Sequence, residues 1–331
     1  MSELRRDPIV GRWVVISTER GAELSDYFIK KCKVKEEFCN YCAGNEGKTP
    51  PEIMAYRPQG GKTDKKPWDL RVIPNKFPAL LMDGSMNRIG DGMYDKMDGI
   101  GTHEVIIETP QHSANIYELP GRKVEDIIWA YRDRIIDLKK DNRLEYVLIF
   151  KNHGVDADAP QSHTHSQLIA TPVVPKKIKE EMKGAKSYYE YKERCVFCDM
   201  IHQEKRDQLR VVFENIGFLA FEPFASRYPF ETWVLPKIHA SNFENIQKKE
   251  VEQLADIMKE INHRISKALN DPPYCYMLHN TPVKENNLIY YHWHIEIVPK
   301  LKNTQGFEWG SSFYINTTSP EESAKFLRGV V

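Results

Sequence analysis

The sequence has no run of apolar residues as long as a membrane-spanning helix, which needs roughly 18 of them. It also has no excess of basic charge, because its 47 Lys and Arg residues are balanced by 47 Asp and Glu residues. Proteins dedicated to nucleic acids carry a clustered basic excess that contacts phosphates, so this class is not expected. Residues Met1 to Pro8 lack the apolar stretch of a secretory signal. Together these absences predict a soluble, cytoplasmic protein.

Cysteine is scarce as well, with six residues in a chain of 331. A disulfide framework is not expected in the cytoplasm, where thiols are kept reduced. Four of the cysteines nevertheless form two close pairs, Cys39 with Cys42 and Cys195 with Cys198. A spacer of two residues lets both thiolates reach one tetrahedral metal ion. A redox-active dithiol is the alternative for a single pair, but it does not explain two copies that are each followed by spaced histidines.

The chain contains an internal repeat that includes both cysteine pairs. The first pair is followed by His112 and His163, and the second by His239 and His292, at nearly the same separation. The first half is longer between its cysteines and its first histidine, which we attribute to an insertion near residues 83–101. Matching order and spacing indicate a duplicated unit.

The pattern of secondary structure repeats in the same way. Apolar residues at helical spacing predict an amphipathic helix over 122–141 and another over 251–265. Each helix is followed by a run rich in β-branched and aromatic residues, which is typical of a strand. The strands are expected at 105–108, 144–150, 232–235 and 274–278.

The expected fold class is therefore α+β, with one helix over an antiparallel sheet in each half. The first unit is predicted to span residues 1–175 and the second residues 190–331. A segment rich in Pro, Lys and Glu, 172–194, is expected to connect them.

Each unit supplies two sulfur and two nitrogen donors, which together make a closed structural zinc site. Zn²⁺ is the expected metal, because its structural sites combine thiolates with imidazoles. The first predicted site is Cys39, Cys42, His112 and His163, and the second is Cys195, Cys198, His239 and His292.

Two residues that follow His163 are expected to carry the chemistry. Side chains alternate along a strand, so His165 and Gln167 point to the same face as His163. With His163 bound to metal, the imidazole of His165 can attack phosphorus and carry a nucleotidyl group covalently. Gln167 is expected to donate an amide N–H to the phosphoryl oxygens, where negative charge develops. Ser166 is small enough to let a phosphate approach the backbone.

The second unit has lost part of this pattern. Glu296 stands where Gln167 stands in the first unit, and a carboxylate repels an anionic phosphoryl group. The bulky Trp293 also replaces the smaller Thr164. Only the first unit is therefore expected to be catalytic, with the second as a structural or substrate-shaping copy.

These motifs make the sequence similar to the galactose-1-phosphate uridylyltransferase family, the transferase branch of the histidine-triad superfamily. The similarity runs nearly from end to end. It implies two fused histidine-triad-like repeats and a ping-pong transfer through a nucleotidyl intermediate on His165. It rests on Arg6–Ile9, Gly11–Val14, Cys39–Asn45, Pro110–Ser113, Phe150–Asn152, His163–Gln167 and His292–Glu296.

The resemblance also implies binding residues and partners. Nucleotide and phosphate contacts would come from Arg20, Asn75, Asn152 and Gln167, with turn formation as the less favoured alternative for Asn75 and Asn152. The substrates would be a nucleotide sugar and a sugar 1-phosphate. The protein would form a homodimer whose active sites borrow residues from the partner.

The second metal site has an alternative in the resemblance. Some family members hold iron there through one Glu and three His residues. The second cysteine pair favours zinc instead. The iron set here would be Glu181, His279, His292 and His294.

The resemblance leaves the base and the sugar open. Uridylyl transfer between UDP-glucose and a hexose 1-phosphate is the favoured activity. The two cysteine pairs also resemble the ADP-glucose phosphorylase branch, which transfers adenylyl groups. A nucleotide hydrolase and a zinc-stabilised nucleotide-binding module without catalysis are further alternatives. Gln167 argues against the hydrolase, because hydrolytic triads carry a third His at that position. The runs shared with the phosphorylase branch include Trp68–Ile73, Tyr228–Glu231 and Asn270–Tyr274.

Overall fold

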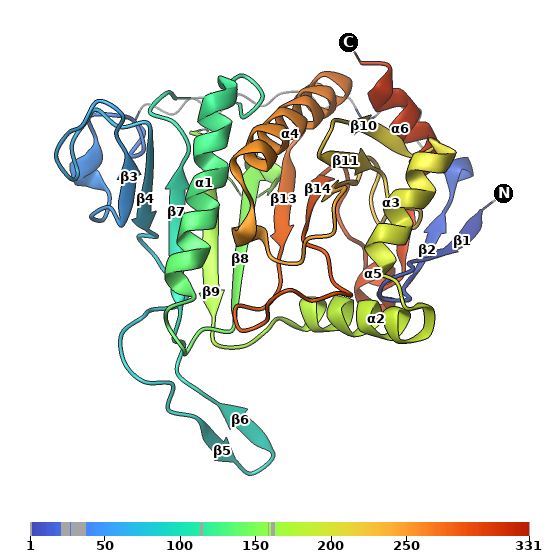
Figure 1. Cartoon of the computed structure of the whole chain (residues 1–331), viewed down its shortest axis with the longest axis horizontal. Helices are drawn as coiled ribbons and strands as arrows, with labels where there is room; N and C mark the ends of the chain where they lie inside the picture. The colour runs from blue at the N-terminus through green and yellow to red at the C-terminus, as the bar shows by residue number, and fades with distance from the viewer. Residues whose placement is uncertain are drawn as a thin grey trace.

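The computed structural model describes residues 2–20, 27, 38–112, 115–157, 159 and 163–330, without the side chain of Arg20. A ten-stranded sheet, antiparallel throughout, runs across the molecule with two long helices packed on one face (Figure 1). The strand order is β10-β11-β12-β14-β13-β8-β9-β7-β4-β3. The predicted α+β class is confirmed.

The first half of the chain builds one end of this sheet. Its helix, α1 (Gly121–Leu138), buries the apolar stripe that the helical spacing predicted and begins after Pro120, which suits a helix start. The strands of this half are β3 (Met54–Tyr56), β4 (Leu70–Pro74), β7 (Thr102–Ile107), β8 (Tyr146–His153) and β9 (His165–Thr171).

The second half builds the other end in the same order. Its helix, α4 (Lys248–Leu269), begins with a capping box in which Gln247 and Glu250 satisfy each other's backbone N–H groups. The strands of this half are β10 (Val211–Glu214), β11 (Phe218–Phe221), β12 (Thr232–Pro236), β13 (Tyr274–His279) and β14 (His294–Pro299).

The two halves share one sheet and one core. β8 pairs with β13 in antiparallel register, with Lys151 opposite Tyr276 at the centre of the pairing. α1 and α4 lie side by side on the same face (Figure 1). The largest apolar cluster contains buried residues of both helices and of strands from both halves. The sequence predicted one antiparallel sheet in each half. In the structure, the two sheets are joined into one, because the strand pairing continues from β8 to β13.

The remaining elements lie around this frame. The insertion near 83–101 contains a hairpin, β5 (Ile89–Asp91) and β6 (Tyr94–Lys96), that projects from the body (Figure 1). The connecting segment contains a helix, α2 (Lys176–Lys192), followed by α3 (Val196–Asp207). A small sheet joins both ends of the chain and is followed by the last helix. Its strands are β1 (Glu3–Arg6), β2 (Trp13–Ile16) and β15 (Tyr314–Asn316), and the nearby helices are α5 (Gly306–Ser311) and α6 (Pro320–Arg328).

Among the described residues, no helix is both long enough and apolar enough to cross a membrane.

Candidate active site and metal centres

The first cysteine pair meets two histidines just before β9. Cys42 Sγ lies 3.4 Å from His112 Nδ1 and 3.6 Å from His163 Nδ1, and Cys39 Sγ lies 3.5 Å from the same His163 nitrogen. The four donor atoms all lie within 4.8 Å of one another. Two thiolates and two imidazoles at this separation suit a tetrahedral zinc ion. The structure thus brings together the first predicted set, whose donor atoms could hold a metal ion.

Hydrogen bonds orient His163 for this role. Its Nε2 donates to the carbonyl oxygen of Thr109 at 2.7 Å, which leaves Nδ1 to face the two sulfur atoms. Burial lowers the pKa of His163 to about 4, so the ring is neutral at physiological pH and its lone pair is available to a metal.

His165 is oriented by the same backbone. Its Nδ1 donates to the carbonyl oxygen of His163 at 2.8 Å, so in the neutral ring Nε2 carries the lone pair. The residue is buried, with 9% of its surface exposed. The Tyr41 ring packs edge-on 5.4 Å from it, and burial raises the pKa of this tyrosine to about 12. An imidazole held this way can act as a nucleophile through Nε2.

Gln167 lies one strand period further along β9 and meets two other side chains. Its Oε1 lies 2.7 Å from His103 Nε2 and 3.4 Å from Asn75 Nδ2. Asn75, which directly follows β4, is thus brought to Gln167. His103 had no predicted role. The period of two places His103, Val105 and Ile107 on one face of β7, but only the pairing of Val105 with Gln167 in the structure brings His103 to the site.

The other predicted binding residues divide into three cases. Asn152 lies at the end of β8, two residues after Phe150, which pairs with Gln167; it is therefore on the face of His165. Ser166 lies on the opposite face, fully buried, and its Oγ accepts a hydrogen bond from Tyr131 of α1 at 2.7 Å. A side chain in that position does not reach the face of His165. The side chain of Arg20 lies outside the described residues.

A buried ion pair supports the strand that carries His165. Lys151 Nζ lies 2.5 Å from Glu108 Oε2 and donates to Thr164 Oγ1 at 2.7 Å and to the His165 carbonyl oxygen at 3.1 Å. Burial would raise the pKa of Glu108, but the Lys151 ammonium outweighs it and lowers that pKa. The sequence predicted no role for either charged side chain, because each stands in a run of residues that is typical of a strand.

The second cysteine pair forms an equivalent cluster. Cys198 Sγ lies 3.4 Å from His239 Nδ1 and 3.9 Å from His292 Nδ1, and Cys195 completes a set within 4.8 Å. His292 Nε2 donates to the Pro236 carbonyl oxygen at 2.9 Å, as His163 does to Thr109. These four residues could therefore hold a second metal ion.

The iron set that the resemblance implied is divided by the structure. His292 uses Nδ1 toward Cys198 and Nε2 toward Pro236, so it belongs to the cysteine cluster. The remaining three residues form a separate buried group within 4.8 Å, namely Glu181, His279 and His294.

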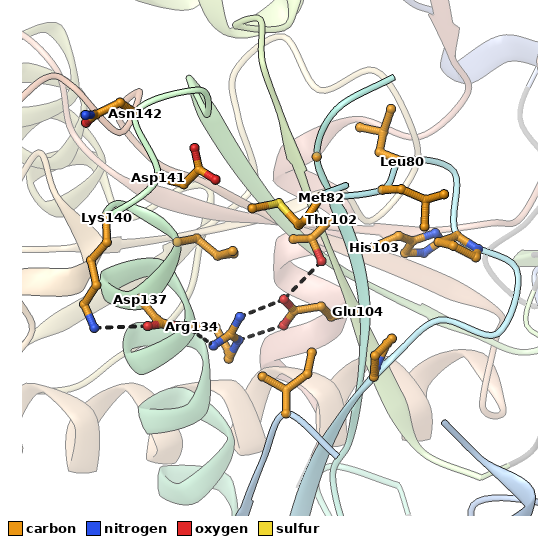
Figure 2. Close-up of a pocket in the computed structure, with 16 residues that line it drawn as sticks. Leu80, Met82, Thr102, His103, Glu104, Arg134, Asp137, Lys140, Asp141 and Asn142 are labelled. Atoms are coloured by element: carbon orange, nitrogen blue, oxygen red, sulfur yellow. Dashed lines mark hydrogen bonds and ion pairs between the residues drawn. The ribbon is translucent and has the colours of Figure 1, made fainter. Parts of the chain in front are cut away.

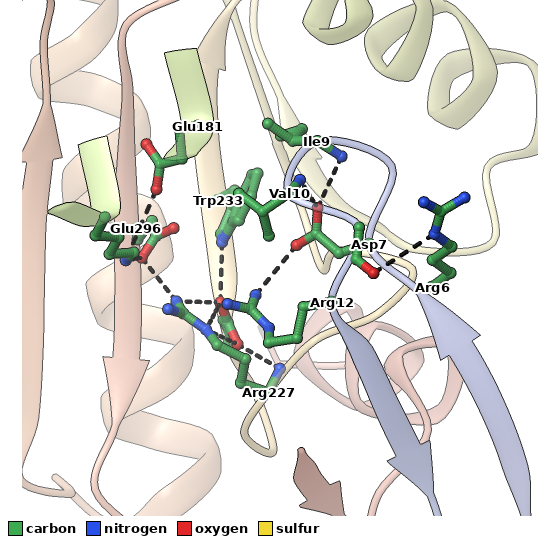
Figure 3. Close-up of polar contacts among 12 residues, drawn as sticks. Arg6, Asp7, Ile9, Val10, Arg12, Glu181, Arg227, Trp233 and Glu296 are labelled. Carbon is green, nitrogen blue, oxygen red and sulfur yellow. Dashed lines mark hydrogen bonds and ion pairs between the residues drawn. The ribbon is translucent and has the colours of Figure 1, made fainter. Parts of the chain in front are cut away.

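Two cations lie beside this separate group. Lys177 Nζ, from α2, is 2.9 Å from Glu296 Oε2 and 3.5 Å from His279 Nε2. Arg227 Nη2 is 2.7 Å from the same Glu296 oxygen, and Figure 3 shows Glu296 between Glu181 and Arg227. Burial would raise the pKa of Glu296, but Arg227 and Lys177 hold it well below its usual range. The carboxylate at the position matching Gln167 is therefore ionised.

Comparisons with known proteins match both halves of the chain. Residues 1–175 match the N-terminal domain of galactose-1-phosphate uridyl transferase, and residues 181–307 match its C-terminal domain. The chain is 37% identical to ADP-glucose phosphorylase of Arabidopsis thaliana over 99% of this chain and 93% of that protein. It is 29% identical to galactose-1-phosphate uridylyltransferase of Thermotoga maritima over 99% of this chain and 98% of that protein.

Solved structures agree with these matches. The crystal structure of an ADP-glucose phosphorylase from Arabidopsis thaliana with bound ADP-glucose superimposes with a TM-score of 0.86 at 35% identity, covering 100% of this chain and 99% of that one. A uridylyltransferase structure superimposes with a TM-score of 0.77 at 26% identity, covering 99% and 97% of the two chains. The chain therefore belongs to the galactose-1-phosphate uridyl transferase family of nucleotidyltransferase enzymes.

Proposed function

We propose that this enzyme transfers a nucleotidyl group from a nucleotide sugar through a covalent intermediate on His165. The observation that carries this proposal is the 2.8 Å bond from His165 Nδ1 to the His163 carbonyl oxygen, which puts the proton of the neutral ring on Nδ1 and makes Nε2 the nucleophilic nitrogen. Nε2 bonds to the α-phosphorus, and the bond from that phosphorus to the oxygen of the sugar 1-phosphate breaks, so the sugar 1-phosphate leaves. In the second step an acceptor phosphate oxygen bonds to phosphorus as the N–P bond breaks.

The other residues of the first site have distinct roles in this proposal. Gln167 donates its amide N–H groups to the non-bridging oxygens, and Asn75 and Asn152 line the same face of the sheet. Zinc, when bound at the first cluster, supplies a rigid anchor rather than a reacting group. Cys39, Cys42 and His112 act only through His163, whose carbonyl group orients His165.

The second unit is proposed to be catalytically silent. His294 is fully buried and packs against the stacked ring of Trp233, with 5.0 Å between ring centroids. The ionised carboxylate of Glu296 lies where an amide would be needed. Both features oppose the approach of a phosphoryl group to His294.

For the base, we favour adenylyl transfer from ADP-glucose, with inorganic phosphate as a candidate acceptor. The support is the higher identity to ADP-glucose phosphorylase, 37% against 29%, and the higher TM-score of the structure with bound ADP-glucose. The sequence alone favoured uridylyl transfer. That activity remains the second candidate, because the Thermotoga maritima relative aligns with 99% of this chain.

A homodimer is also proposed. The C-terminal segment with α5 lies beside β1 and β2, at the far end of the sheet from β9 (Figure 1). The resemblance implies active sites that borrow residues from a partner, and in this proposal the C-terminal segment serves the site of a second copy. Light scattering on the purified protein tests the homodimer. A monomeric mass in the presence of saturating substrate would contradict it.

The decisive experiment uses nucleotide sugars labelled at the α-phosphorus, without an acceptor. We expect acid-labile label on His165 from ADP-glucose, none on the His165→Gly variant, and undiminished label on His294→Asn, the matched variant of the second unit. Label from UDP-glucose alone would select uridylyl transfer. Absence of label from both, with metal bound, would leave a nucleotide-binding module and end the catalytic proposal.

A further inference from the structure

His103 contacts Gln167 more closely than any of the predicted site residues does. It lies on β7, on the face that carries His165 and Gln167, and its Nε2 is 2.7 Å from Gln167 Oε1. At this distance the contact is a good hydrogen bond. Which atom donates determines what the bond does to the glutamine.

The protonation of His103 is set by its other nitrogen. The backbone N–H of Ala79 donates to His103 Nδ1 at 3.3 Å, so in the neutral ring the proton is on Nε2. His103 therefore donates to Gln167 Oε1. Asn75 Nδ2 lies 3.1 Å from His103 Nε2 and 3.4 Å from the same glutamine oxygen. With the His103 proton on Nε2, neither nitrogen can accept from the other, so both N–H donors share the one acceptor, Gln167 Oε1.

Two converging donors fix the orientation of the Gln167 amide. If the amide turned over, its NH₂ group would face the N–H groups of His103 and Asn75, with no acceptor between them. The oxygen must therefore face His103. The NH₂ end is directed away from His103 and is the end that can donate to a phosphoryl oxygen.

The backbone of His103 holds the second donor as well. Its carbonyl oxygen accepts from the Asn75 backbone N–H at 2.8 Å. The Asn75 Oδ1 is already occupied by the Phe77 N–H at 2.9 Å, so the Asn75 amide also cannot turn over without losing a bond. One residue therefore organises both Asn75 and Gln167.

The surroundings of His103 make these bonds important. A cavity of about 820 Å³ adjoins the residue, between β7, the loop that carries Leu80 and the end of α1 (Figure 2). The neighbour Glu104 points instead to Arg134 of α1, with both oxygens bonded at 2.7 Å. The imidazole is open to the cavity on one side, so hydrogen bonds rather than close packing decide its position.

We infer that His103 is a positioning residue for nucleotidyl transfer, which holds the Gln167 amide with its N–H groups toward the phosphoryl oxygens. This inference rests on the proposed function. It assigns His103 no contact with substrate and no proton transfer. Its effect is to keep Gln167 in one of two orientations that would otherwise be nearly equivalent.

The test compares five proteins by the rate at which His165 takes up label in a single turnover. These are the wild type, His103→Leu, His103→Gln, Gln167→Ala and the double variant His103→Leu/Gln167→Ala. Leu is close to His in size and lacks the donor, whereas the Gln amide carries an N–H near the place of Nε2. The probe is the accepted nucleotide sugar with sulfur in place of either non-bridging α-oxygen.

We expect His103→Leu to slow labelling by about 10- to 100-fold, somewhat less than loss of a direct oxyanion donor. It should also weaken the preference between the two sulfur diastereomers, which a merely structural defect would not change. His103→Gln should restore most of both. The double variant should be no slower than Gln167→Ala, because the two residues act as one unit.

The matched control is Thr102→Val, which removes a side-chain hydrogen bond from the preceding residue of β7, on the opposite face of the strand. Metal content and circular dichroism establish that each variant is folded. His103→Leu labelling as fast as Thr102→Val would overturn the inference, as would multiplicative effects in the double variant. Absence of label in the wild type would instead overturn the proposed function, and the inference with it.

Discussion

His165 donates a hydrogen bond from Nδ1 to the carbonyl oxygen of His163, the residue whose own Nδ1 faces the first cysteine pair. The second unit repeats this relationship, with His294 Nδ1 donating to the His292 carbonyl oxygen at 3.1 Å. In both halves, a histidine of a cysteine–histidine cluster thus orients the histidine two residues later. The two units differ in what surrounds that second histidine, rather than in how it is held.

Replacement of Cys39 by Ser, compared with Cys195→Ser, should show which cysteine–histidine cluster supports the chemistry. We expect loss of one metal equivalent, a fall in the free energy of unfolding of about 4 kcal/mol or more, and slower labelling of His165, because His163 loses its anchor. Cys195→Ser, the matched change in the second unit, should also lose one equivalent but keep most labelling. Elemental analysis, thermal unfolding and the labelling assay measure these. Equal loss of labelling in both variants would contradict the assignment of chemistry to the first unit.

The sequence predicted those parts of the site that depend on local spacing. A two-residue spacer between cysteines and a period of two along a strand are properties of neighbouring residues, so both metal clusters and the His165 orientation followed from them. The same period also places Ser166 on the face opposite His165, which the prediction of a phosphate contact there overlooked. Ser166 instead accepts a bond from Tyr131.

The missed parts depend on contacts between distant segments. His103 meets Gln167 only because β7 pairs with β9 in the register that sets Val105 opposite Gln167. The charge run at the start of α2 is typical of a solvated helix start, but Lys177 reaches the buried Glu296 of β14. Such pairings are set by tertiary packing, which local patterns in a single sequence do not reveal.

Replacement of Lys151 by Met should be strongly destabilising, because it leaves the Glu108 carboxylate buried without its cation. We expect a loss of about 3–5 kcal/mol in the free energy of unfolding. The double variant with Glu108→Gln should recover part of this loss. Lys140→Met is the control, since Lys140 pairs with Asp137 at the surface and its loss should cost no more than about 0.5 kcal/mol. Urea unfolding measures all three, and similar losses for Lys151→Met and Lys140→Met would be inconsistent with a buried pair.

Glu222 should make stability fall as pH rises. It is buried and accepts a hydrogen bond from Ser323 of α6, and burial, aided by the carboxylates of Glu231 and Glu321, raises its pKa well above the usual range. A raised folded-state pKa contributes stability that is complete below the ordinary value of 4.5 and is lost as pH rises through the folded-state pKa. Glu222→Gln cannot ionise, so its stability relative to the wild type should increase by about 1 kcal/mol or more between pH 5 and pH 8.

Glu321, on the same helix as Ser323, provides the opposite sign. Burial would raise the pKa of Glu321, but hydrogen bonds from Arg5 and Arg210 lower it. Its stabilising contribution is present above the ordinary value of 4.5 and is lost as pH falls through the depressed folded-state pKa. Glu321→Gln should therefore be less stable than the wild type at pH 8, and the difference should shrink in acid. Parallel pH profiles for the two variants would rule out a protonated Glu222.

The number of bound metal ions is predicted to be two per chain. The group of Glu181, His279 and His294 has a geometry that suits a third ion, but the ammonium of Lys177 lies 3.5 Å from His279 Nε2 and 2.9 Å from Glu296. A resident ammonium and a divalent cation compete for the same carboxylates and repel each other. After dialysis against zinc or ferrous iron, elemental analysis should find two equivalents in the wild type and a third in Lys177→Met. Lys176→Met, which removes an exposed neighbour paired with Glu180, should still bind two. A wild-type protein with three equivalents would mean that the ammonium yields its place to a metal, and that the second unit keeps a cation site that its cysteines do not supply.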